Sequence, residues 1–333
     1  MKKIISLFLL ILTTVGFSQS KKKFKQFYSS IRNAKTQTTL FVVNQQYTLQ
    51  QYEDILKEAW TVTPFKVIYN KDYNIVECAK NNYSVVSIGV LHEDYEIREN
   101  STTTRITNSN FYYEYTYLNL SKIPKKNPAY NIYKKHIRNI GGFLLKGHNY
   151  FNPANFYKPL NKNNAYTLYD ILYEPNLFIN SDLLSLQSEF KKLNLMVENN
   201  TKSTYRKGKH LINKNKRRQL HTLVSDTLYI PYGTPKMSYK QYAYPYKVVP
   251  YRQIQEKVLS GEHVKYLITD SKEAPYSTLY FADIIDSKTG LPLLKLKSGS
   301  TLIANDSFLF GRRFYRKLFL KINKKVSKAK TFD

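Results

Sequence analysis

Residues 39–88, TLFVVNQQYTLQQYEDILKEAWTVTPFKVIYNKDYNIVECAKNNYSVVSI, decide the fold of this chain. Residues 39–43 are rich in β-branched and aromatic side chains, and the run is too short and too stiff for a helix. They predict a strand that is buried on both faces. Residues 65–69 and 83–88 have the same character and predict two further strands. The stretch therefore predicts a sheet with its first strand in the core.

Two helices are expected between these strands. Thr48 and Gln51 have the spacing of a capping box, and apolar residues recur at helical spacing from there to Trp60. Pro64 cannot continue this helix, and Asn70 can cap a second, shorter one. Crossovers of this length favour parallel strands with right-handed connections. The predicted order is therefore β-α-β-α-β.

The second half of the chain repeats the first. Residues 227–231 read TLYIP against TLFVV at 39–43, and residues 245–249 read PYKVV against PFKVI at 64–68. The two offsets are 188 (227 − 39) and 181 (245 − 64), so the second copy has a deletion of seven residues (188 − 181) between these segments. Because the deletion falls where the first copy has its helix ending at Trp60, a loop is expected in place of most of that helix.

Each copy is also expected to contain an antiparallel hairpin. Residues 103–108 and 111–120 predict two strands separated by a short polar break, with an acidic turn before them at 92–96. Residues 278–285 and 291–296 predict two strands joined by a Lys-Thr-Gly turn. The correspondence of the two hairpins supports an internal duplication.

The predicted fold class is α/β, with two related β-α-β-type units and a helical connecting region. Each unit has a mainly parallel core sheet and an added antiparallel hairpin. The connecting region is expected to hold a short helix at 132–140 and a longer helix at 181–198. The expected signal peptide, first unit, connecting region and second unit with a basic C-terminal helix occupy residues 1–18, 24–125, 126–219 and 220–326.

Sequence features in both halves carry a family resemblance. AWTVTPF at residues 59–65 closes the first helix, and TLYIP and PYKVV follow in the second half. In this arrangement the chain resembles uncharacterised exported proteins of Bacteroidota-type bacteria that carry paired small α/β units. The resemblance implies the fold and an exported location, and it supplies no catalytic residue.

The N-terminus has the three-part form of a secretory signal peptide. Lys2 and Lys3 precede an apolar run at 4–17, which is followed by small and polar residues. We expect cleavage after Ser18 and export across the inner membrane to the periplasm or beyond. The apolar run is shorter than the roughly 20 residues that cross a bilayer as a helix, so no transmembrane helix is expected after cleavage.

The chain is strongly basic, with 52 Lys and Arg against 24 Asp and Glu and a net charge of +28. Loss of Lys2 and Lys3 with the signal peptide leaves +26 (28 − 2). Such a field attracts polyanions, including lipopolysaccharide, anionic lipid head groups, nucleic acid and acidic polysaccharide. The alternative is a composition bias, because the accompanying Asn, Ile and Tyr are what AT-rich codons supply. Predicted export argues against specific DNA binding.

Two segments are candidates for a polyanion site. Residues 205–218 are the most basic stretch, and the alternative for such a run is a solvated surface. Residues 306–326 predict a basic amphipathic helix, which either lies on an anionic membrane or closes a domain with its apolar stripe. The candidate binding residues are Arg206, Lys207, Lys209, Lys214, Lys216, Arg217, Arg218, Arg313, Lys317, Lys321 and Lys324.

No catalytic, metal or cofactor motif is present in the sequence. The six histidines are scattered without paired metal-ligand spacing, and neither GxSxG nor GxGxxG occurs. Cys78 is the only cysteine, which predicts a buried free thiol. The leading hypothesis is a non-enzymatic exported protein for envelope interaction or scaffolding. The alternatives are a polyanion or anionic-membrane binding protein, and a hydrolase with a dispersed site.

Overall fold

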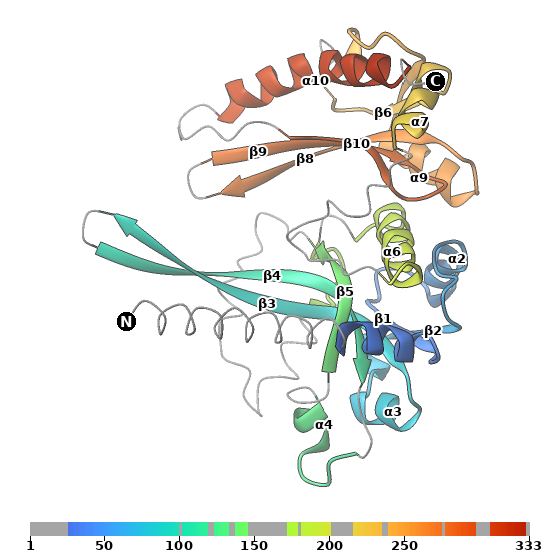
Figure 1. The fold of residues 1–333 in the computed structure, drawn as a ribbon, viewed down its shortest axis with the longest axis vertical. Coiled ribbons are helices and arrows are strands. Elements are labelled where there is room, and N and C mark those ends of the chain that lie inside the picture. The colour runs from blue at the N-terminus through green and yellow to red at the C-terminus, as the bar shows by residue number, and fades with distance from the viewer. Residues whose placement is uncertain are drawn as a thin grey trace, which may run out of the picture. The chain divides into compact units, whose positions relative to one another are not determined.

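The chain forms two units, which are shown as a computed structural model in Figure 1. Unit 1 comprises residues 1–182 and 193–208, and unit 2 comprises residues 183–192 and 209–333. The structure describes residues 26–99, 102–118, 123–132, 137–145, 172–178, 181–200, 216–234, 239–274, 277–297 and 307–330. The predicted signal peptide at 1–18 lies outside these residues.

Unit 1 is built on a five-stranded mixed sheet in the order β2-β1-β3-β4-β5. The central strand β1 pairs in parallel with β2 and β3, while β3 with β4 and β4 with β5 are antiparallel. All five residues of β1 are buried, as the sequence predicts. The strands are β1 Thr39–Val43, β2 Phe65–Tyr69, β3 Ser84–Glu99, β4 Thr102–Leu118 and β5 Ile137–Leu145.

Unit 2 has a second five-stranded sheet with the same topology. Its order is β10-β9-β8-β6-β7, in which β6 pairs in parallel with β7 and β8 and the remaining pairs are antiparallel. The strands are β6 Leu228–Pro231, β7 Tyr246–Val249, β8 Lys265–Ala274, β9 Ser277–Asp286 and β10 Pro292–Lys297. The two similar sheets confirm the predicted α/β fold of two related units.

A β-bulge at the same place in both sheets strengthens this match. The pairing of β4 with β5 passes over Ile140, and the pairing of β9 with β10 passes over Leu293. The flanking pairs are Thr116 with Asn139 and Tyr115 with Gly141 in unit 1, and Ile285 with Pro292 and Ile284 with Leu294 in unit 2. Thr116 also lies opposite Val85, and Ile285 lies opposite Tyr266, 181 residues later (266 − 85). A bulge bends a strand and fixes its register, so its repetition indicates one design used twice.

The strand register corrects the sequence alignment of the two copies by one residue. Thr39 donates its backbone N–H to Pro64 O at 2.8 Å, and Leu228 donates to Pro245 O at 3.0 Å. Thr39 therefore corresponds to Leu228 rather than to Thr227, with an offset of 189 (228 − 39). The second copy is consequently shorter by eight residues (189 − 181) instead of seven.

The first helix of unit 1 forms as predicted. In α2, Leu49–Ala59, the Thr48 side chain and Gln51 make a complete capping box, and the chain leaves the helix at Trp60. The second helix, α3 Ile75–Lys80, is capped by the side chain of Asn74. Asn70, the predicted cap, instead begins a short 3-10 turn. Right-handed crossovers place α2 and α3 on opposite faces of the sheet (Figure 1).

Three predictions for unit 1 are wrong. The expected acidic turn at 92–96 and the polar break at 108–110 both lie inside the long strands β3 and β4, which pair from Val85–Thr116 to Glu99–Thr102. Continuous backbone pairing between these strands outweighs the turn propensity of their polar residues. Within the expected helix at 132–140, residues 137–140 instead belong to β5, which pairs with β4, while residues 133–136 lie outside the described residues.

A buried network of hydroxyl groups surrounds the start of β1. The Thr39 hydroxyl contacts the hydroxyls of Thr63 at 2.7 Å, Ser84 at 3.2 Å and Tyr115 at 3.3 Å. The Trp60 indole N–H donates to the Thr63 hydroxyl at 2.8 Å. All five side chains are buried. Hydrogen bonding compensates the cost of burying these polar groups and ties three strands to the end of α2.

Helix α6, Leu183–Glu198, confirms the helix predicted at 181–198. Its residues up to 192 belong to unit 2, where the Ser188 hydroxyl donates to Gly290 O at 2.9 Å. Its later residues belong to unit 1, where Asn194 Oδ1 accepts the backbone N–H of Thr61 at 2.8 Å. The region predicted as a connection thus contributes to both units, and a short helix α4, Pro128–Asn131, also lies in it.

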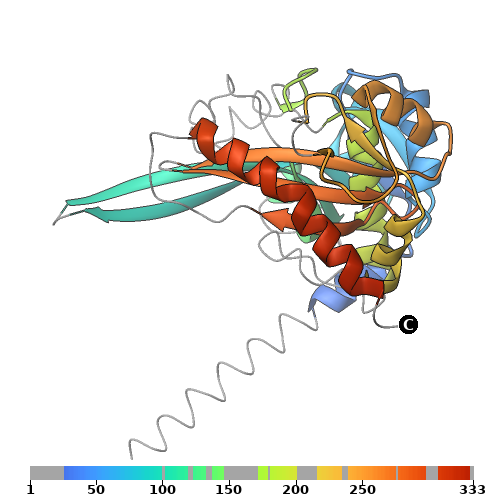
Figure 2. The same ribbon diagram turned by 90° about the horizontal axis from the view of Figure 1, so that it is seen from above.

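Unit 2 has helices on both faces of its sheet. One face, with Leu228 and Ile230 of β6, packs against α7 and α10. The other, with Tyr266 and Ile285, packs against α9 and the start of α6. Figure 2 shows α10 lying across the strands. The elements are α7 Lys216–His221, the 3-10 turn η4 Thr222–Val224, α9 Tyr251–Leu259 and α10 Ser307–Lys330.

Two adjacent glycines in β5 generate a stability prediction. A Cβ at Gly142 would lie 2.0 Å from the backbone oxygen of Tyr113, whereas a Cβ at Gly141 would meet the end of the flexible Met196 side chain. We expect Gly142→Ala to lower the free energy of unfolding by about 3 kcal/mol and Gly141→Ala by about 1 kcal/mol, because only a side chain can move aside cheaply. Urea denaturation of both variants measures the difference, and equal losses would contradict the close approach of β4 and β5.

Cys78 generates a reactivity prediction. The thiol is buried and free, as the sequence predicts, and burial raises its pKa to about 11. Since the thiolate is the reactive form, Ellman's reagent at pH 8 should leave the folded chain unmodified and should label one thiol after unfolding in urea. A Cys78→Ser chain with an exposed Lys71→Cys change is the positive control and should react within seconds. Rapid labelling of the native wild-type chain would show that α3 does not protect Cys78.

Candidate polyanion-binding surface

Helix α10 is anchored in unit 2 by its apolar stripe. The stripe lies in the same cluster as Leu220 and Leu223, which follow the start of α7, and Leu228 and Ile230 of β6. Its buried residues are Phe314, Leu318, Phe319, Ile322, Val326 and Ala329. Of the two sequence-based alternatives for this helix, the docked one is therefore observed. The apolar stripe is already covered by protein.

The opposite side of α10 carries lysines. Lys317, Lys321 and Lys324 are exposed, together with Lys325 and Lys328. Positions three or four residues apart lie on one side of a helix, and at 1.5 Å per residue the row from 317 to 328 is roughly 16 Å long. The helix contains no Asp or Glu between 307 and 330. We call these five side chains the lysine face.

The acidic groups of unit 2 are engaged elsewhere. Each carboxylate whose side chain is described in this unit contacts a group outside α10. The pairs are Glu189 with Lys192, Asp226 with Lys265, Glu256 with Arg252, Glu262 with Lys257, Asp283 with Lys295, and Asp286 with the backbone N–H of Lys288. Within the described residues, Lys317, Lys321, Lys324 and Lys325 have no carboxylate partner. Their positive charge therefore faces solvent uncompensated.

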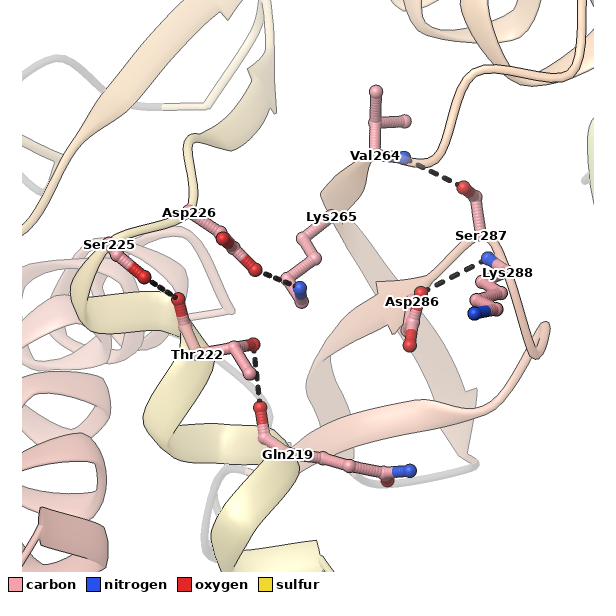
Figure 3. A network of polar contacts seen from close by, with 9 residues as sticks. All are labelled: Gln219, Thr222, Ser225, Asp226, Val264, Lys265, Asp286, Ser287 and Lys288. Atoms are coloured by element: carbon pink, nitrogen blue, oxygen red, sulfur yellow. Dashed lines mark hydrogen bonds and ion pairs between the residues drawn. The ribbon is translucent and has the colours of Figure 1, made fainter.

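Several of these polar contacts stabilise turns. In Figure 3, Asp226 pairs with Lys265 where the chain enters β6, and the Thr222 hydroxyl donates to Gln219 O at 2.8 Å at the end of α7. In the turn between β9 and β10, the Ser287 hydroxyl accepts the Val264 N–H at 2.8 Å. These groups explain local structure and are not arranged as a catalytic set.

Asp283 is one of the partly buried members of this group and lies within β9. Burial raises the pKa of its carboxyl group, and the neighbouring Lys295 and Lys192 oppose that rise. Its carboxylate lies 3.5 Å from Lys295 Nζ. The charge of Asp283 is therefore balanced by a lysine of the neighbouring strand.

The structure brings together part of the predicted candidate set. Lys317, Lys321 and Lys324 share the lysine face, and Arg313 belongs to the same helix. Lys216, Arg217 and Arg218 form the start of α7, whose Leu220 shares a cluster with α10. Arg206, Lys207, Lys209 and Lys214 lie outside the described residues. Of the basic segment at 205–218, the described part is therefore the start of a helix that packs with α10 in unit 2.

A tyrosine-rich segment at residues 232–246, of which 232–234 and 239–246 are described, contacts α10 through residues 241–243 and was not recognised from sequence. The Asn323 side chain donates to Gln241 O at 2.7 Å and accepts the Ala243 N–H at 3.1 Å. The buried ring of Tyr242 contacts Phe319 with 5.6 Å between ring centroids. This segment replaces the helix that α2 forms in unit 1. The available signal was the concentration of tyrosines in the place of that helix.

Other kinds of site are not seen in the described part of the chain. No three His, Cys, Asp or Glu residues there are grouped so that they could hold a metal ion. None of the described helices is both long enough and apolar enough to span a bilayer.

The resemblance to exported Bacteroidota proteins stays a prediction of the sequence. Searches against protein-family models, curated proteins and solved structures find no match to this chain.

Proposed function

We propose that this chain is an exported, non-enzymatic interaction protein of the cell envelope that binds polyanions through the lysine face of α10. The observation that carries the proposal is the separation of the two sides of this helix. Its apolar side belongs to the core of unit 2, and its exposed side carries Lys317, Lys321, Lys324 and Lys325, which have no carboxylate partner among the described residues. The predicted signal peptide supports the location.

The burial of the apolar stripe specifies the mode of binding. An amphipathic helix that lies in a membrane interface inserts its apolar side among the acyl chains. The described residues of that side in α10, with Leu318 and Ile322, are buried, and Leu320 at 52% is the large apolar residue that is exposed among the described residues of the helix. Binding therefore rests on charge, so we expect it to weaken steeply with added salt.

Lysine is suited to this kind of contact. Its ammonium group is a hydrated point charge on a flexible stem, whereas defined phosphate sites usually use planar arginine forks. Lys317, Lys321 and Lys324 follow one another along the helix and match a repeating row of negative charges better than a single anion. The partner class is therefore an extended polyanion.

The proposal is tested with inorganic polyphosphate, which presents charge without sugars, bases or acyl chains. In the full mature chain, Lys317→Gln, Lys321→Gln and Lys324→Gln together should weaken binding at least tenfold at low salt. The slope of log K against log salt should become shallower by about 2, since three contacts at roughly 0.7 each are lost. Isothermal titration calorimetry at several salt concentrations gives both quantities.

The matched control removes the same charge from unit 1. Lys57, Lys71 and Lys80 are also exposed, and none belongs to α10. Changing these three to Gln should leave the affinity within about twofold of wild type, because long-range charge is screened over about 10 Å at 0.1 M salt. Equal weakening by the two triple variants would assign binding to net charge alone and would reject the lysine face as a site.

A further inference from the structure

A tyrosine platform lies next to the lysine face. Tyr232 is 66% exposed and Tyr246 is 36% exposed, which is unusual for rings that an α/β unit could bury. Tyr246 contacts Tyr239 at 5.9 Å and Tyr242 at 6.2 Å between ring centroids, so its ring packs against two other tyrosines. The Tyr246 ring is thus held by a packed cluster.

The platform runs along the edge of the sheet. The Tyr232 N–H donates to Val249 O at 2.9 Å at the end of β7, and Tyr246 begins that strand. Three residues at about 3.3 Å each separate the two ends, or about 10 Å. Among the described strands β7 pairs only with β6, and Lys247 on it is exposed. Tyr246 and Lys247 are consecutive in β7, so their side chains lie on opposite faces of this edge strand.

Hydrogen bonds and a ring contact connect the tyrosine segment to α10. Asn323 of α10 bonds to both Gln241 and Ala243, and Phe319 of α10 packs on Tyr242. A ligand that crosses from the tyrosines to the lysines therefore contacts one rigid body within unit 2. Leu320, exposed on α10, lies three residues before Asn323 along that path.

Two buried hydroxyls in the same segment retain hydrogen-bonding capacity. The Thr234 and Tyr242 side chains are 7% and 5% exposed, and their hydroxyl oxygens have no hydrogen-bond partner in the described part of the chain. Buried hydroxyls normally have a protein, water or ligand partner. Both oxygens are buried within the segment and do not form part of its exposed surface.

We infer that the polyanion bound by unit 2 is an acidic polysaccharide, with sugar rings stacking on Tyr232 and Tyr246 and carboxylates paired with the lysine face. The inference rests on the proposed function and names its ligand class. A tyrosine ring has an apolar face and a polar tip, which complements the apolar face and hydroxyl rim of a sugar. The lysines of the described face pair with carboxylates as point charges, and the choice of a sugar chain over other polyanions rests on the tyrosine rings.

The test compares polyanions with and without sugar rings. Polygalacturonate carries carboxylates on sugars, polyphosphate carries charge alone, and dextran carries sugars alone. With the full mature chain, Tyr232→Ala with Tyr246→Ala should weaken polygalacturonate binding about tenfold and leave polyphosphate binding unchanged. The triple lysine variant should weaken both, and dextran should bind far more weakly than polygalacturonate.

A conservative variant separates stacking from folding defects. Tyr232→Phe with Tyr246→Phe keeps both rings and should retain polygalacturonate affinity within about threefold. Tyr232→Ala alone changes a ring that is mostly in solvent, so it should leave the melting temperature unchanged and still reduce affinity. A reduction that appears only together with a lower melting temperature would overturn the inference.

The outcomes distinguish this inference from the proposed function. If polyphosphate binding depends on the lysine face but the alanine variants bind polygalacturonate like wild type, the tyrosine platform is rejected and the polyanion site stands. If polyphosphate does not bind, the proposed function fails. If oligo(dT) binds more tightly than polygalacturonate and loses affinity in the alanine variants, the rings stack on bases and the polysaccharide assignment is overturned.

Discussion

The structure depends on a central strand that must have parallel neighbours on both sides. β1 and β6 each pair in parallel with two strands that follow them in sequence. Antiparallel neighbours could be joined by tight turns, but each parallel pair needs a crossover that covers one face of the sheet. This constraint decides which face of each sheet a crossover helix covers. A face without a crossover helix must be covered by another element.

The two copies satisfy the interior around the central strand with different chemistry. In unit 1, Thr39 links the hydroxyls of Thr63, Ser84 and Tyr115. In unit 2 the equivalent positions of Thr39, Tyr115 and Ser84 are Leu228, Ile284 and Lys265, as the strand registers show. The first two join an apolar cluster, and Lys265 pairs with Asp226. The polar network of unit 1 is therefore one solution to a shared backbone, and the fold does not require it.

Sequence reasoning succeeded where the deciding interactions are local. The capping box of α2, the buried run of β1 and the turn with Gly290 at a φ of 66° are all set by residues within a few positions of one another. It failed for β5, because Ile137 and Ile140 also have helical spacing and only pairing with β4 decides for a strand. The turn at 92–96 and the break at 108–110 were wrongly predicted for the same reason, because only the pairing of β3 with β4 shows that these polar residues belong to strands.

The candidate surface also combines a feature that local sequence predicts with one that depends on tertiary contact. The amphipathic and basic character of α10 was legible in the sequence, since the alternation of Leu318 and Ile322 with lysines is local. The tyrosine segment was not, because its role depends on contact with α10 through Asn323, which lies about eighty positions away in sequence. Sequence pattern therefore identified a charged helix, and tertiary contact identified what stands beside it.

The loss of one helix connects the fold of unit 2 to its surface. In unit 1, Trp60 at the end of α2 packs on Phe41, whose equivalent in unit 2 is Ile230. In unit 2 the shortened connection has no helix comparable with α2 in its described residues, and α10 packs over Ile230 instead. A helix recruited to cover this face must be apolar on one side only, so its other side is free to carry charge. The described carboxylates of unit 2 make their contacts outside α10. Within the described residues of unit 2, no ion pair therefore neutralises Lys317, Lys321, Lys324 or Lys325. In unit 2, α10 thus takes the place that α2 has in unit 1. The same replacement covers the sheet and exposes the lysines.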